Sequence, residues 1–236
     1  MKEIMNDINN IEELPKNKDK IVEMKIEAHD FDIDECGYLT VDDITDKDIG
    51  YLERQIRNSY EYKSYIEYLK TELDLNQCKL LPQLDLMENP VGLEMHHYPF
   101  TLYDITNIIS RQMISKAEED GSGAVSSFDI AERVMKEHYE NNVGLIPLTS
   151  TLHQMAHNKS LIIPLEYVNG NYGNFVNKYS EYIDDDTRNK LNEELIASDS
   201  EDARELNELK LQKKIIHYNI EYTGPEDPDD IDDYEF

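Results

Sequence analysis

The sequence contains no tryptophan and only two cysteines, Cys36 and Cys78, among its 236 residues. The two cysteines lie far apart and form no CxxC pair, which excludes a disulfide framework and a zinc site built from cysteines. This cysteine usage is that of a reducing cytosol. Hydrophobic residues make up 39% of the chain, but the missing tryptophan and a mean hydropathy of -0.69 predict a core of modest size.

Long apolar runs are also missing. No stretch reaches the ~18 consecutive apolar residues that a membrane span needs. Residues 1–10 are rich in acidic and amide side chains and lack the apolar centre of a signal peptide. We therefore expect a soluble, unexported, cytoplasmic protein with no membrane partner.

Positive charge is scarce: 23 Lys and Arg stand against 51 Asp and Glu, for a formal net charge of -28. This balance argues against simple electrostatic attraction to nucleic acid. The charge is uneven, because residues 90–170 hold ten acidic and five basic side chains and so carry -5. The flanks of the chain carry the remaining -23.

Composition and hydrophobic periodicity divide the chain into five parts. These are a flexible N-terminal arm (1–20), an N-terminal region with a long helix (21–89), a central core (90–170), C-terminal helices (171–220) and a disordered acidic tail (221–236). The long helix is predicted over 48–73 from apolar residues recurring at threes and fours. The predicted fold is α+β and predominantly helical.

Two further helices are predicted inside the central core. Thr101 is an N-cap candidate with Asp104 three residues later, and Ser126 with Asp129 repeats the pattern. Helices running to about 117 and 139 would form a helical insertion over 101–140. His138, near the end of the second helix, is read as a dipole partner or a surface residue.

Four of the seven histidines lie in two short pieces on either side of this insertion. His96 and His97 are adjacent on an extended segment, so their side chains point to opposite faces and only one can face a given metal. His153 and His157 are four apart, so on a helix they lie on one face and can bind one ion together. This arrangement provides three ligands, leaves coordination positions open, and leaves one histidine free to act as a base.

The elements that carry these histidines have a recognisable order. The apolar stretch 145–148 predicts a strand, and Thr149 supplies a capping hydroxyl for a short helix that carries His153 and His157. A strand with two histidines, a second strand and a short helix with two histidines form the supersecondary unit of a ββα-metal site. We therefore predict a ββα-metal core made of two short antiparallel strands and a helix, interrupted by the helical insertion.

Glu94-Met95-His96-His97, the Leu-Ile-Pro-Leu strand and His153-x-x-x-His157 together resemble the HNH or ββα-metal (His-Me finger) endonucleases, including the colicin-type DNases. The matching residues cover about 93–100 and 142–158. The resemblance implies that His96 joins His153 and His157 as a metal ligand and that His97 is the general base.

The resemblance also implies two supporting residues. Glu94 takes the acidic position before the histidine pair and would orient a ligand. The family's asparagine is expected near Gly144, where Asn142 is the nearest candidate and Asn141 the next, and its amide would hold the ring of His97. The chain departs from the family in having Thr149 and Leu152 where many members have cysteines, and in the length of the 101–140 insertion.

The implied chemistry is hydrolysis of DNA phosphodiester bonds by a metal-dependent endonuclease. A neutral His97 would accept the proton of the attacking water, while a divalent ion stabilises the phosphate and the leaving oxygen. The ligand set leaves the ion open among zinc, nickel, magnesium and manganese. DNA is then the substrate.

The acidic flanks support a different function. Residues 221–236 contain eight acids and no Lys or Arg, which is typical of a disordered tail that solubilises the chain or docks onto a basic protein partner. The chain would then be a noncatalytic, acidic, protein-binding or DNA-mimicking factor built on an HNH-like scaffold. Its richness in Asn, Ile, Lys and Asp fits an AT-rich phage or bacterial genome.

Overall fold

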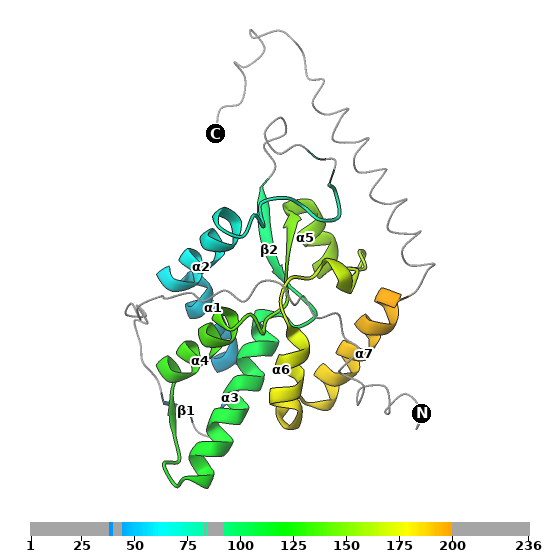
Figure 1. Ribbon diagram of the computed structural model, residues 1–236. Helices are drawn as coiled ribbons and strands as arrows, with labels where there is room; N and C mark the ends of the chain where they lie inside the picture. The colour runs from blue at the N-terminus through cyan, green and yellow to red at the C-terminus, as the bar shows by residue number, and fades with distance from the viewer. Residues whose placement is uncertain (1–37, 40–43, 83, 85–91, 200–236) are drawn as a thin grey trace, which may run out of the picture.

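The computed structural model describes residues 38–39, 44–82, 84 and 92–199 (Figure 1). The predicted arm at 1–20 and the acidic tail at 221–236 lie outside these residues. The described part is mainly helical, with two small antiparallel sheets of two strands each. The prediction of a predominantly helical α+β fold is confirmed.

The central sheet pairs β2 (Leu93–His97) with β4 (Leu145–Thr149) in antiparallel register, with His96 opposite Ile146 and His97 opposite Leu145. Both strands form where the sequence predicts them. The helix α5 (Ser150–His157) follows β4 directly and packs on both strands. Its N-cap is Thr149, whose side-chain oxygen accepts from the backbone N–H of Leu152 at 3.4 Å.

The insertion between the two strands folds into α3 (Leu102–Glu119) and α4 (Ser127–Tyr139), which pack on each other. Thr101 and Asp104 form a reciprocal capping box at the start of α3, and Ser126 caps α4 through the N–H of Asp129. The predicted caps are confirmed. Between the helices, β3 (Val125–Ser126) pairs with β1 (Tyr38–Leu39).

The prediction of one helix over 48–73 is wrong. The chain instead forms α1 (Asp46–Asn58) and α2 (Tyr60–Thr71), with Ser59 in extended conformation between them. The hydroxyl of Ser59 donates to the carbonyl of Ile56 at 2.7 Å and accepts from the N–H of Tyr62 at 3.1 Å. A serine hydroxyl competes with the helical hydrogen bonds in this way, and apolar spacing alone does not reveal it.

The C-terminal part of the described chain returns to the start of β4, where Asn169 and Leu145 exchange backbone hydrogen bonds of 2.8 Å. It consists of the 3-10 turn η2 (Leu165–Tyr167), α6 (Tyr172–Tyr179), the 3-10 turn η3 (Ser180–Tyr182) and α7 (Asp185–Asp199). Asp184 joins η3 to α7: its carboxylate accepts from the N–H of Thr187 at 2.7 Å and pairs with Arg111 at 3.2 Å. Helices are found in the described part of the region predicted to hold them (171–220), and residues 200–220 lie outside the described residues.

Buried apolar residues form two clusters on the two faces of the β2–β4 sheet. The larger cluster joins α1, α2, α3, α4 and α6, and Met95 and Leu145 contribute to it from the strands. The smaller cluster contains Tyr98, Ile146 and Leu152 and lies on the α5 side. Alternation along β2 therefore sends Glu94 and His96 toward α5. None of the helices in the described part of the chain has the length and hydropathy to cross a membrane.

Candidate metal centre

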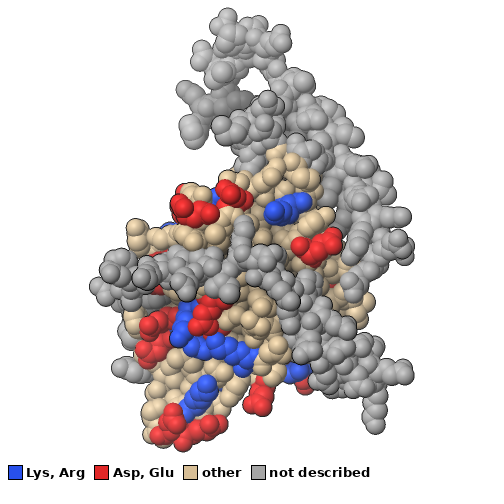
Figure 2. Space-filling view, in the orientation of Figure 1, with Lys and Arg blue, Asp and Glu red and all other residues tan. Residues whose placement is uncertain are grey.

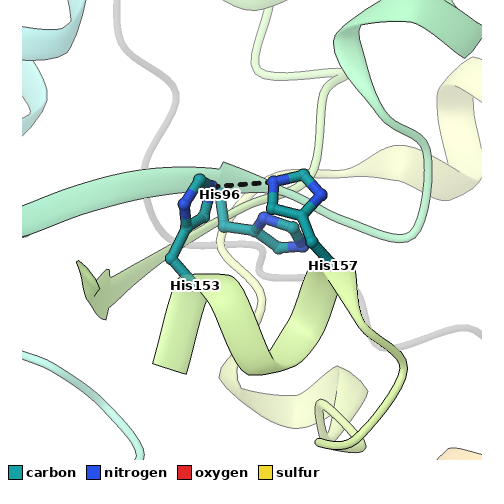
Figure 3. A group of neighbouring side chains, drawn as sticks. All are labelled: His96, His153 and His157. Carbon is teal, nitrogen blue, oxygen red and sulfur yellow. Dashed lines mark hydrogen bonds between the residues drawn. The ribbon is translucent and has the colours of Figure 1, made fainter. Parts of the chain in front are cut away.

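Three of the four predicted histidines converge between β2 and α5. The ring of His96 lies 4.9 Å from the ring of His153 and 5.0 Å from that of His157, measured between centroids. Figure 3 shows His153 and His157 rising from one face of α5 toward His96 on the strand. The three predicted metal ligands are thus neighbours, because a strand face and a helical i,i+4 pair meet across the packed ββα unit.

The spacing of their nitrogens suits a small divalent ion. One ligand atom from each ring can be chosen so that all three lie within 4.8 Å of one another. The Nε2 atoms of His153 and His157 are 3.2 Å apart. Two nitrogens on one tetrahedral zinc ion, each at about 2.0–2.1 Å from the metal, would be roughly 3.3 Å apart. The helical pair has this separation.

Glu94 fixes the orientation of one ring. Its carboxylate oxygen Oε2 lies 2.7 Å from Nδ1 of His153. Nδ1 of His153 is then the protonated nitrogen and donates to the carboxylate, which leaves the lone pair of Nε2 directed at the cluster. The acidic residue expected before the histidine pair is therefore in contact with a candidate ligand.

Burial keeps the imidazoles of His96 and His153 neutral, which is the form that binds metal. Burial, followed by the neighbouring rings of His153 and His157, lowers the pKa of His96 to about 3. Burial also lowers the pKa of His153, and the carboxylate of Glu94 partly opposes that shift. At neutral pH His96 and His153 thus present unprotonated nitrogens to an ion.

His97 is not brought to this cluster, which corrects the position expected for a general base. Its side chain is 4% exposed and points to the opposite face of β2, where its Nε2 lies 3.0 Å from Nε2 of His138. It stacks on Tyr62, with ring centroids 6.0 Å apart. The cause is the alternation of strand side chains: once His96 faces α5, its neighbour must face the larger core.

His138 was read from the sequence as a dipole partner or surface residue, but it is 1% exposed. Its Nδ1 donates to the carbonyl of Val134 at 2.8 Å, so its Nε2 is the acceptor of the His97 N–H. Burial lowers the pKa of His138 to about 4 and holds that of His97 well below its usual value. The two rings form a neutral, hydrogen-bonded pair within the core.

Asn142 also has a different partner from the one expected. Its side-chain amide donates to Glu137 at 2.8 Å and to Glu140 at 3.2 Å, and no such contact with His97 occurs in the described structure. Glu137 is fully buried and also accepts from Lys178 and Tyr179, each at 2.7 Å. A buried carboxylate needs several donors, and Asn142 is one of them.

Charged side chains of both signs are interspersed over the described surface of the face drawn in Figure 2. Only the part of the chain that the structure describes is shown in colour there. This distribution matches the count for residues 90–170, which is far less acidic than the flanks.

The fold and the cluster define a mainly helical protein with a ββα unit that gathers three histidines. The chain belongs to the family described as Bacteriophage G278-like virion protein, whose model matches residues 1–223. The predicted phage origin is confirmed at this level. No curated protein and no solved structure gives a significant match to the chain.

Proposed function

We propose that this chain is a metal-dependent endonuclease that hydrolyses DNA phosphodiester bonds at the cluster of His96, His153 and His157. The convergence of these three imidazoles, with ligand atoms within 4.8 Å of one another, is the observation that carries the proposal. Three protein nitrogens leave at least one coordination position for substrate, as catalytic zinc sites do.

Each residue of the cluster has a defined part in the proposal. His96, from the rigid strand β2, and the α5 pair hold the ion, and Glu94 keeps the Nε2 of His153 turned toward it. When bound, the ion supplies positive charge for the scissile phosphate and the departing oxygen. All-imidazole ligation favours zinc or nickel by affinity, and manganese or magnesium remain alternatives.

His97 and Asn142 are assigned to the fold in this proposal. His97 donates to His138 and Asn142 donates to Glu137, so both groups are engaged within the larger core. The proton of the attacking water would therefore pass to solvent on the exposed side of His157 rather than to His97.

The acidity of the chain requires an external source of DNA affinity. With 51 acidic and 23 basic residues, the free protein would be repelled by a phosphate backbone. We propose that a basic protein of the virion docks on the acidic flanks and brings the site to DNA.

A noncatalytic function is the second candidate, and the position of His97 favours it. Without that histidine beside the ligands, the three-histidine cluster could bind an ion that only holds the ββα unit together. The chain would then be an acidic virion protein that binds other proteins or mimics DNA on an HNH-like scaffold.

Plasmid nicking separates the two candidates. Supercoiled plasmid and single-stranded circular DNA are each incubated with the full-length protein and Mg²⁺, Mn²⁺, Ni²⁺ or Zn²⁺, alongside His153→Ala and the control Gln154→Ala. Gln154 is an exposed neighbour on α5 that takes no part in the cluster. The proposal predicts metal-dependent cleavage by the wild type and the control, and its loss in His153→Ala. Metal binding without cleavage of either DNA under any condition would favour the noncatalytic candidate.

A further inference from the structure

A cavity of about 330 Å³ opens beside the histidine cluster, and His96 and His157 are among its lining residues. Its other walls come from three places: the segment 159–163 after α5, the turn between β2 and α3, and the helix α7. A molecule in this cavity would therefore lie against two of the three candidate metal ligands.

The size and lining of the cavity suit one small organic group. Small-molecule sites typically measure about 300–1,000 Å³. At about 330 Å³ the cavity lies at the small end of this range, which suits a group of the size of one nucleotide. Pro99, Leu161, Ile163 and Ala197 provide apolar walls against which a sugar or a base can pack.

Two lysines, Lys159 and Lys190, line the cavity. Lys159 follows α5 with an exposed side chain, and no ion pair to it occurs in the described structure. Lys190, on α7, is held by an ion pair with Asp104, with Nζ and Oδ2 2.9 Å apart. One ammonium group is thus available and the other has a fixed position, as expected for groups that contact a phosphate.

Two carboxylates balance these lysines. Glu193 and Glu194 also line the cavity, and Glu194 accepts a hydrogen bond from the hydroxyl of Tyr98 at 2.6 Å. The formal charges of the two lysines and two glutamates that line the cavity cancel, and Asp104, which pairs with Lys190, adds one negative charge beside it. A divalent ion on the neighbouring histidines would make the cavity positive, so binding of an anion there should strengthen when the metal is present.

We infer that this cavity binds one unpaired nucleotide, with its phosphate directed to Lys159 and Lys190 and its nucleoside against the apolar walls. This inference rests on the proposed function and narrows its substrate to single-stranded DNA or an unpaired end. In duplex DNA the base is paired and stacked, so it would have to leave the helix to enter the cavity.

Calorimetric titration of the full-length protein tests the inference. Thymidine 5′-monophosphate, inorganic phosphate and thymidine are each added to the zinc-loaded and to the metal-free protein. We expect the monophosphate to bind more tightly than either fragment, and zinc to raise its affinity. Lys159→Ala should weaken it by about tenfold or more, the usual effect of losing a charged hydrogen bond. Lys116→Ala, which removes an exposed lysine of α3 outside the cavity, should leave it unchanged.

The outcomes distinguish this inference from the nuclease proposal. Equal affinities of Lys159→Ala and Lys116→Ala for the monophosphate, or binding no tighter than that of phosphate alone, would overturn the nucleotide site even if plasmid is nicked. Tight, lysine-dependent binding without cleavage of either plasmid or single-stranded circular DNA would sustain the nucleotide site and overturn the nuclease. An Ala197→Phe variant, which fills the cavity from α7, should lose the monophosphate but keep zinc.

Discussion

The carboxylate of Glu94 lies 2.7 Å from Nδ1 of His153, across the boundary between strand β2 and helix α5. This contact links the acidic residue before the histidine pair to the helix that carries the other two candidate ligands. It sets which nitrogen of His153 faces the cluster, and so it makes the metal site depend on a residue that binds no metal itself.

Removing the carboxylate of Glu94 should therefore weaken metal binding. We expect Glu94→Ala to lower zinc affinity by about 10–100-fold, the usual effect of losing such a partner. Glu94→Gln, whose amide oxygen can still accept from Nδ1, should lose less. Calorimetry with zinc chloride measures the change, and Glu166→Ala, an exposed glutamate of η2, is the matched control. An unchanged affinity in Glu94→Ala would show that the contact does not orient a ligand.

The buried pair of His97 and His138 leads to a prediction about stability. Each single substitution to alanine leaves the other ring without its hydrogen bond, so we expect each to lower the free energy of unfolding by about 1–3 kcal/mol, besides the loss of packing. The double variant should cost less than the sum of the two, because the interaction is lost only once. Urea unfolding of the wild type, the two single variants and the double variant gives the coupling energy between the two histidines.

The zinc affinity of the His97 variant checks whether His97 belongs to the core and not to the metal site. His97→Ala should keep it, since the ring of His97 points away from the cluster. A His97→Ala protein that unfolds like the wild type and binds zinc, yet no longer nicks plasmid, would contradict the structural assignment and restore the catalytic one.

Much of the site was accessible from sequence because it depends on local rules. Side chains on a strand alternate between its two faces, and a helix brings residues three or four apart onto one face. The spacing of His96, His153 and His157 was therefore enough to predict that their side chains converge. The caps Thr101 and Ser126 were equally local, since each hydroxyl bonds a backbone N–H three residues on.

The remaining partners depend on contacts that spacing does not encode. His97 and His138 are 41 residues apart, and their meeting depends on how α4 packs against the far face of β2. The alternation of side chains along the strand did indicate that His97 faces away from His96. The family resemblance nevertheless assigned His97 to the metal site, against that indication. Asn142 was likewise assigned to the site by its place in a motif. Its actual contact is with the buried carboxylate of Glu137, which needs hydrogen-bond donors.

The low pKa of His138 predicts a pH dependence of stability. Burial lowers this pKa from 6.5 to about 4, so the unfolded chain binds a proton more readily than the folded one. The stability that this neutral ring supports is fully present above pH 6.5 and is lost as the pH falls toward 4. One such proton corresponds to a slope of about 1.4 kcal/mol per pH unit.

Urea unfolding at a series of pH values measures this dependence. In His138→Gln the slope over that window should be smaller than in the wild type. A slope that the substitution leaves unchanged would assign the acid sensitivity to other groups.

Glu137 should be among the most sensitive positions of the insertion. Its carboxylate is fully buried and accepts from Lys178 and Tyr179, while Arg133 lies 3.2 Å away. Removing one partner of a buried ion pair typically costs about 3–5 kcal/mol. We expect that loss from Glu137→Ala.

A control substitution for the unfolding free energy of Glu137→Ala lies about one and a half turns earlier on the same helix. Glu132 is exposed on α4, and Glu132→Ala should change the unfolding free energy by less than about 0.5 kcal/mol. The pKa of Glu137 is lowered: burial would raise it, but the bonds from Lys178, Tyr179 and Asn142 outweigh that effect. Its contribution is therefore present above pH 4.5 and lost below it, a lower window than that of His138.

Two glycines should respond to alanine in opposite directions. At Gly144, which precedes β4, an added Cβ would lie 1.9 Å from the backbone oxygen of Tyr98, whose own N–H donates to the Gly144 carbonyl at 3.0 Å. Neither backbone can move without breaking the end of the β2–β4 pairing, so Gly144→Ala should cost at least about 1–3 kcal/mol. It should also weaken zinc binding, because the displaced strand carries His96.

Gly50 lies inside α1, where the nearest atoms to an added Cβ are 4.0 Å away. Gly50→Ala should raise stability by about 0.5–1 kcal/mol through helix propensity alone and leave zinc affinity unchanged. Thermal unfolding with and without zinc compares the two, and equal effects would contradict the close backbone approach at Gly144.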